Sequence, residues 1–161
     1  MTTASPPRDP ADLTRFIEEE YHARHRVQLP ALIALSEKVE IAHAGQTRVP
    51  TGLTELLRNM ASELEALMRK EEYLLFPAIR VSATGLETPI AALRASQHDL
   101  TTDISRIHQF TNNLIPPETA CQSWTRLYTK ISVFLDDLGE HIRLENDVLF
   151  LQFETRGNSH V

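Results

Sequence analysis

Cysteine and glycine are both scarce in this sequence. The chain of 161 residues contains one cysteine, Cys121, and five glycines. A single cysteine cannot form an intramolecular disulfide, so the fold has to depend on an apolar core, which a chain of this length can bury in one domain. Alternation of apolar and polar residues, the pattern of a half-buried strand, is almost absent as well. These absences point to one domain that is not built from sheets.

Clustered positive charge and long apolar runs are also missing. The formal net charge is −6 at pH 7, the sequence pI is about 5.6, and the basic residues are scattered. Nucleic acid is therefore not expected as a partner, because its recognition needs a concentrated basic surface. No segment resembles a signal peptide, a membrane span, a glycine-rich phosphate loop or a nucleophilic serine or cysteine site. The sequence predicts a cytoplasmic protein without membrane contacts.

Helix-breaking residues occur in four groups, which leave four long segments between and after them. The groups are SPPRDP near the start, RVPTG at 48–52, TGLETP at 84–89 and IPP at 115–117. A capping side chain or a proline in the first turn is typical of a helix start. The expected starts are Asp9–Pro10, Thr51, Thr88–Pro89 and Pro117–Glu118.

Apolar residues in these segments recur at steps of three and four, the spacing of one helix face. One stripe runs through Leu53, Leu57, Met60, Leu64, Leu67 and Leu74, and another through Ile131, Phe134, Leu138 and Val148. Short connections between amphipathic helices favour antiparallel neighbours. We predict an all-α fold, an antiparallel up-down four-helix bundle over residues 10–155, with a disordered tail at 1–9 and a second tail at 156–161.

Titratable residues interrupt the apolar stripes at positions that face the core. In EHIRLENDVLF at 140–150, the stripe of the fourth segment continues through His141 and Glu145, and Glu71 lies on the stripe of the second segment. In the first segment, at least one of His22 and His25 faces inward. A lone buried histidine or glutamate usually has a local partner. Two glutamates and two histidines on three stripes would need several partners, whereas one metal centre would serve all of them.

The spacing and chemistry of these donors suggest the kind of metal. His141 and Glu145 lie about one helical turn apart on one face. Imidazole and carboxylate donors in a bundle core suit iron or manganese, and glutamates can bridge two metals. His43 is excluded from a cluster with His22, because the helix between them would be about 31 Å long. His98 lies off the stripe of its helix, on a face that either meets another helix or is solvated.

Four ordered motifs resemble those of a known family. YHARHRVQLPALI at 21–33, RKEEYLLFPAI at 69–79, SQHDL at 96–100 and HIRLENDVLF at 141–150 are similar to the hemerythrin-like domain of the iron–sulfur cluster repair di-iron proteins, the repair-of-iron-centres or ScdA-like group. The resemblance implies a bundle that holds a non-haem di-iron centre, with both glutamates as bridges. The ligands it implies are His22, Glu71, His98, His141 and Glu145.

Two departures from the family pattern affect what can be expected. Leu67 stands where the family has a histidine four residues before the glutamate, so the second iron is expected to be weakly bound, and replacing Leu67 with histidine should complete its site. His25 is the first alternative ligand for that position. The family usually has a small N-terminal domain with paired cysteines, which this chain is expected to lack.

The resemblance implies a protein of the nitrosative and oxidative stress response, linked to iron–sulfur cluster repair and nitric oxide handling. Its expected partners are nitric oxide or oxygen and iron–sulfur proteins. One alternative is a hemerythrin-type protein that binds or senses oxygen or nitric oxide without turnover, and another is a degenerate bundle with one metal. Whether the protein is an enzyme stays open, because these functions need the same bundle and the same site.

Overall fold

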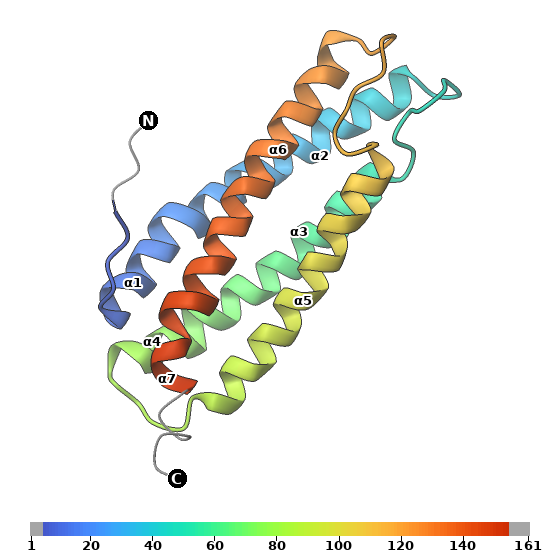
Figure 1. Ribbon diagram of the computed structural model, residues 1–161. Helices are drawn as coiled ribbons and strands as arrows, with labels where there is room; N and C mark the ends of the chain where they lie inside the picture. Colours follow the sequence, from blue (N-terminus) through green and yellow to red (C-terminus); the bar gives the residue numbers. More distant parts are fainter. Residues whose placement is uncertain (1–4, 155–161) are drawn as a thin grey trace.

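Four helical arms packed side by side form the structure (Figure 1). The computed structural model describes residues 5–154, and no strand occurs among them. Arm 1 consists of α1 (Pro10–Phe16), η1 (Ile17–His22) and α2 (Ala23–Ala42), and arm 2 of α3 (Leu53–Lys70), η2 (Glu71–Leu75) and α4 (Phe76–Arg80). Arm 3 is α5 (Glu87–Phe110), and arm 4 consists of α6 (Gln122–Arg143), η3 (Leu144–Leu149) and α7 (Leu151–Glu154). Successive arms run in opposite directions, which confirms the predicted all-α four-helix bundle.

The predicted bundle limits, residues 10–155, stay a prediction. Helical elements extend from Pro10 to Glu154. The predicted tail at 156–161 and the first residues of the tail at 1–9 lie outside the described residues, so these boundaries stay predictions. Across the described range, none of the helices combines the length and apolar character needed to cross a bilayer.

The first two helix starts show how different groups satisfy the free backbone N–H groups at a helix N-terminus. Asp9 caps α1 as predicted, since its carboxylate accepts a hydrogen bond at 3.0 Å from the backbone N–H three residues later. Thr51 does not cap α3. Instead, the carboxylate of Glu40 on arm 1 accepts hydrogen bonds from the backbone N–H groups of Gly52 and Thr54, both at 2.8 Å.

The other two predicted starts are displaced along the chain. α5 begins at Glu87, so Thr88 lies inside the first turn rather than at the cap. α6 begins after Cys121 and not at the Pro117–Glu118 pair, and the Sγ atom of Cys121 accepts a hydrogen bond from the backbone N–H of Trp124 at 3.4 Å. A helix is capped by whichever side chain reaches its end in the folded chain. That side chain need not be the nearest capping residue in the sequence.

The predicted apolar stripes form the core, but each shifts where a π-helical turn interrupts its arm. Leu74, expected on the stripe of arm 2, is 71% exposed, and Leu75 is buried instead. In arm 4, Leu149 is fully buried, whereas Val148 is only half-buried. The turns η2 and η3 contain these positions. A π-helical turn is wider than an α-helical turn, so it rotates the side chains that follow it relative to the α-helical period.

Candidate metal centre

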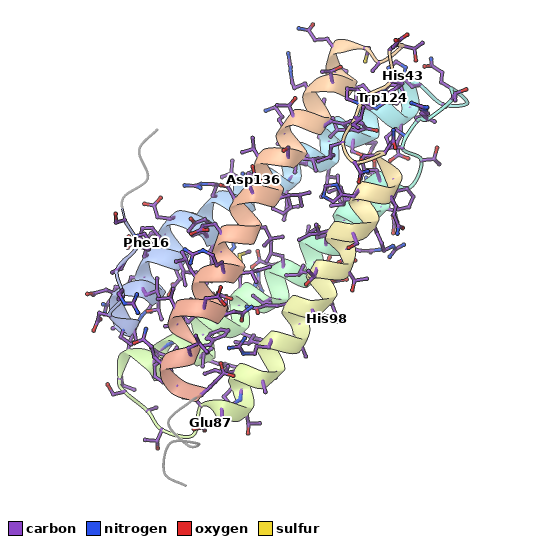
Figure 2. All side chains as sticks on the ribbon, viewed as in Figure 1. Phe16, His43, Glu87, His98, Trp124 and Asp136 are labelled. Atoms are coloured by element: carbon purple, nitrogen blue, oxygen red, sulfur yellow. The ribbon has the colours of Figure 1, made fainter. Side chains whose placement is uncertain are left out.

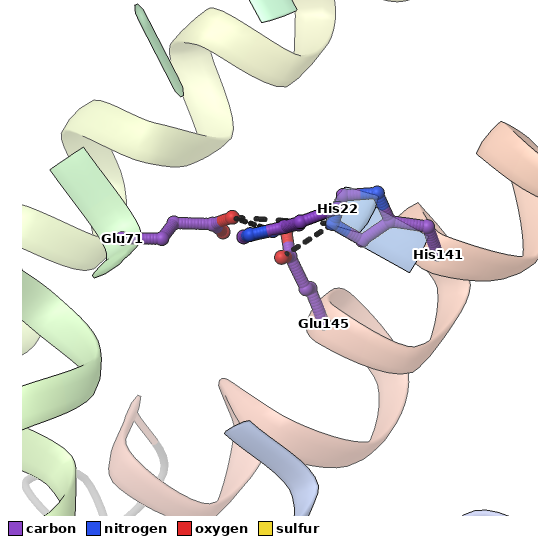
Figure 3. A group of neighbouring side chains, drawn as sticks. All are labelled: His22, Glu71, His141 and Glu145. Carbon is purple, nitrogen blue, oxygen red and sulfur yellow. Dashed lines mark hydrogen bonds and ion pairs between the residues drawn. The ribbon is translucent and has the colours of Figure 1, made fainter. Parts of the chain in front are cut away.

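Four titratable side chains from three arms meet inside the bundle (Figure 3). His22 is the last residue of η1, Glu71 is the first of η2, His141 lies in the last turn of α6, and Glu145 lies in η3. Their ligand atoms all lie within 4.8 Å of one another, and none of the side chains is more than 1% exposed. Two imidazoles and two carboxyl groups therefore share one buried space.

Three of these four residues lie in π-helical turns. Each turn closes with a backbone hydrogen bond between residues five apart, for example from Phe76 N–H to the Glu71 carbonyl and from Phe150 N–H to the Glu145 carbonyl at 2.7 Å. Such turns are rare in proteins and are frequent at functional sites. Here they contain three of the four side chains of the group, His22, Glu71 and Glu145.

Each histidine of the group faces a carboxylate oxygen. His22 Nε2 lies 3.0 Å from Glu71 Oε1, and His141 Nε2 lies 2.8 Å from Glu145 Oε2. His141 Nε2 is also 3.9 Å from Glu71 Oε1, so one oxygen of Glu71 lies near both imidazoles. The other oxygen, Glu71 Oε2, is buried and has no hydrogen-bond partner among the described residues. An unpaired buried carboxylate oxygen is costly, which calls for a cation or a proton beside it.

Burial controls the protonation of this group. It lowers the pKa of His22 to about 4, so the ring is neutral at physiological pH. Burial and the nearby charge of Glu145 raise the pKa of Glu71. Burial also acts to raise the pKa of Glu145, but the nearby His141 and its hydrogen bond to Glu145 lower it to about 2. Metal ions bind neutral imidazole and deprotonated carboxylate, so a cation here would replace the proton that the raised pKa favours on Glu71.

The ring of His22 is oriented by contacts on its outer side. Its Nδ1 atom lies 2.7 Å from Glu72 Oε2, and Arg26 donates to the same oxygen at 2.7 Å. Arg26 also forms a pair of hydrogen bonds with Glu65, at 2.9 and 3.0 Å. When Nδ1–H donates to Glu72, the lone pair of Nε2 points into the group. This carboxylate–histidine arrangement is characteristic of metal-ligating histidines.

His141 is oriented in a similar way by His25. The His25 side chain is fully buried, and its Nε2 atom lies 3.0 Å from Nδ1 of His141. His25 Nδ1 lies 3.3 Å from Gln28 Oε1, and Gln28 donates to Asp137 Oδ2 at 2.7 Å. Both histidines of the first segment thus face inward, but only His22 joins the group of four. His25 lies behind His141 and does not replace the missing ligand at position 67.

The chain matches the family described as "Hemerythrin HHE cation binding domain" over residues 15–152. It belongs to this family. It is 40% identical over 141 residues to the iron–sulfur cluster repair protein YtfE of Pectobacterium atrosepticum, covering 87% of this chain and 64% of the relative. The same protein from Yersinia pseudotuberculosis is 42% identical over 140 residues, covering 86% and 63%, and that from Salmonella paratyphi B is 43% identical over 141 residues, covering 87% and 64%. The predicted resemblance is confirmed, and the chain spans just under two thirds of the length of these relatives.

In this hemerythrin-family chain, the structure brings together four of the five predicted ligands and places His98 apart from them. His98 is exposed on α5 (Figure 2), and Gln97 occupies the inward position, where its Nε2–H donates to Glu145 Oε1 at 2.6 Å. Neighbouring residues on a helix point about 100° apart, so both cannot face the group. The assignment of His98 as a ligand is therefore corrected. The sequence carried a signal for Gln97, which continues the stripe of Leu93 and Leu100.

Leu67 is placed as the sequence predicts for this hemerythrin-family chain. It is buried on α3, one turn before Glu71. Aromatic rings complete the walls of the group: Phe76 stacks on His22 with ring centroids 5.9 Å apart, and Tyr21 stacks on His141 at 5.8 Å. Apolar walls of this kind exclude water and strengthen electrostatic interactions inside the site.

Proposed function

We propose that this chain binds iron through His22, Glu71, His141 and Glu145. The observation that carries the proposal is the fully buried Glu71 Oε2, which has no hydrogen-bond partner in the described part of the chain and lies beside neutral imidazole and a second carboxyl group. A divalent cation would neutralise this group and use its nitrogen and oxygen donors. Two nitrogen and two oxygen donors without thiolate suit iron or manganese, and the name of the relatives favours iron.

We infer that the bound iron serves the repair of iron–sulfur clusters, the role named in the relatives. The partners would then be iron–sulfur proteins with damaged clusters, and nitric oxide or oxygen would be a small ligand of the centre. When bound, the iron supplies a transferable cation and an affinity for diatomic gases. The chain's own residues would hold it in a dry space, since Phe76 stacks on His22, Leu67 is buried one turn before Glu71, and Glu72 orients His22.

Iron loading and iron transfer together test this function. Protein loaded anaerobically with ferrous iron and then desalted should retain iron. It should also restore the visible absorbance of an iron–sulfur protein whose cluster has been damaged by nitric oxide. Glu145→Ala should lose both properties, whereas His43→Ala should keep both, because His43 lies at the far end of the bundle beside Trp124 (Figure 2). Folded wild-type protein that retains no metal would overturn the proposal.

Deep burial of the donors favours a second candidate, a protein that holds its iron and binds a gas without turnover. All four side chains are at most 1% exposed, which opposes easy release of a cation. Titration of the reduced, iron-loaded protein with nitric oxide separates the two functions. A stoichiometric spectral change without iron transfer supports gas binding, and iron transfer to the damaged cluster supports repair.

A further inference from the structure

The carboxylate oxygens of the two glutamates determine how many cations the centre can hold. Glu71 Oε1 faces His22, and Glu71 Oε2 has no hydrogen-bond partner within residues 5–154. Glu145 Oε2 faces His141, and Glu145 Oε1 accepts the 2.6 Å hydrogen bond from Gln97. Two metals bridged by both glutamates would need a free second oxygen on each. Of the two, only Glu71 has a second oxygen without a hydrogen-bond partner, because the amide of Gln97 takes one lone pair of Glu145 Oε1.

The amide of Gln97 has one possible orientation in this contact. A carboxylate can only accept hydrogen bonds, so the NH₂ group faces Glu145 and Oε1 points elsewhere. Gln97 is 3% exposed, and its Oε1 has no hydrogen-bond partner in the described part of the chain. A cation at Glu145 Oε1 would lie beside the positively polarised NH₂ group of Gln97, and displacing that group would leave a buried amide donor unpaired; both are unfavourable.

The side chains around this oxygen offer little else to a second metal. Leu67 fills the position one turn before Glu71 and has no donor atom, and His98 points to solvent. Within residues 5–154, His22, Glu71, His141 and Glu145 form the one group of at least three histidine, cysteine or acidic side chains close enough to share an ion. The donors therefore suffice for one cation and not for two.

The geometry points to Gln97 as the residue that limits this centre to a single metal ion per chain. This inference rests on the proposed metal binding. Gln97 acts by placing its NH₂ group against Glu145 Oε1, which disfavours a second cation there and leaves Oε2 for a cation beside His141. It follows that adding a donor at position 67 is not enough to create a second site. The sequence alone suggests that Leu67→His would complete the second site, and the structure adds that Gln97 also has to be replaced.

Cobalt(II) titration followed by absorbance, with metal analysis of the desalted protein, measures the stoichiometry directly. Wild type and Leu67→His should both saturate at one metal per chain. The double variant Leu67→His with Gln97→His should saturate at two, since it releases Glu145 Oε1 and adds two imidazoles. Leu67→His with Gln109→His is the matched control, because Gln109 is an exposed glutamine of the same helix, and it should stay at one.

The outcomes separate this inference from the proposed function. If the wild-type protein binds two metals per chain, the role of Gln97 is overturned but the proposed metal binding stands. The same holds if the single variant Leu67→His binds two metals per chain. A folded double variant that stays at one would also overturn it. Folded wild-type protein that binds none would instead overturn the proposed function. The wild-type and Leu67→His stoichiometries test the inference even where the double variant does not fold.

Discussion

His25 Nε2 and His141 Nδ1 lie 3.0 Å apart, although 116 residues separate them in the sequence. The rings are stacked, with centroids 5.1 Å apart and planes 24° from parallel. Burial and the neighbouring His141 lower the pKa of His25 to about 3, so His25 is neutral at physiological pH. Because Nδ1–H of neutral His25 donates to Gln28 Oε1, Nε2 of His25 accepts a hydrogen bond from Nδ1–H of His141. This contact sets the rotation of His141 and directs its Nε2 atom toward the glutamates.

Replacing His25 should weaken metal binding without abolishing it. In His25→Ala, His141 loses the partner that orients it, and loss of such an outer contact typically lowers metal affinity about 10- to 100-fold. Competition with a chelator of known affinity measures the change. His98→Ala is the control, because His98 is exposed outside the group, and it should leave the affinity unchanged. Equal losses in the two variants would contradict the placement of both residues.

Cys121 should react with alkylating agents faster than an ordinary thiol near neutral pH. The backbone N–H of Trp124 and the His43 imidazole, whose Nε2 lies 3.0 Å from Sγ, lower the pKa of the Cys121 thiol against the opposing effect of burial. More thiolate is then present at neutral pH. Cys121 is the single cysteine of the chain, so mass spectrometry of iodoacetamide-treated protein follows it without ambiguity.

The control for this reactivity is His43→Ala, which removes the imidazole and keeps the backbone donor. The pH at which alkylation reaches half of its maximal rate should rise in this variant. The result that would contradict this is a wild-type pH profile of alkylation with its midpoint in the usual range of thiols and no shift in His43→Ala. It would show that His43 does not stabilise the thiolate.

Glu63 on α3 and Asp103 on α5 should make the stability pH-dependent. Glu63 is an exposed residue, but partial desolvation of its carboxyl group, a hydrogen bond with Asp103 and the nearby Asp103 charge raise its pKa from 4.5 to about 7. A raised folded-state pKa means that the folded protein binds the proton more tightly than the unfolded chain. This contribution to stability is complete below pH 4.5 and is lost as the pH rises through about 7.

Glu63→Gln should remove this pH dependence and raise the thermal midpoint at alkaline pH. The buried Asp103 Oδ2 has no hydrogen-bond partner among residues 5–154, and the new amide can donate to it. Thermal unfolding at acidic and alkaline pH measures the effect. Glu118→Gln, an exposed change of the same type, should behave like wild type. Parallel pH curves for wild type and Glu63→Gln would exclude this pair as the cause.

Two glycines should respond in opposite directions to substitution by alanine. Gly52 has φ 96° and an added Cβ would lie 3.1 Å from Phe110 Cε1, so Gly52→Ala should destabilise the fold by about 1 to 2 kcal/mol. Gly139 lies inside α6 and an added Cβ meets nothing within 4 Å, so Gly139→Ala should stabilise by about 0.5 to 1 kcal/mol. Urea denaturation compares the two. A loss of stability at Gly139 that matches the loss at Gly52 would contradict this explanation.

The sequence by itself determined the elements and much of the centre. Spacing within one helix is a local property, so apolar stripes identified the arms, and the four-residue step from His141 to Glu145 placed both on one inner face. Glu71 followed from the same rule. The family motifs also marked His22, and the departure at Leu67 was visible without coordinates. Each of these features depends on residues that are close together along the chain.

Tertiary structure decided what depends on rotation between helices. Helical periodicity did not separate His22 from His25, and the packing of arm 1 against arm 4 places His22 in the group and His25 behind it. It favoured His98 over Gln97 by motif, but the rotation of α5 turns the amide inward. The π-helical turns are fixed by the folded backbone and shift each stripe after them, so a regular period cannot anticipate which side chains they turn toward the core.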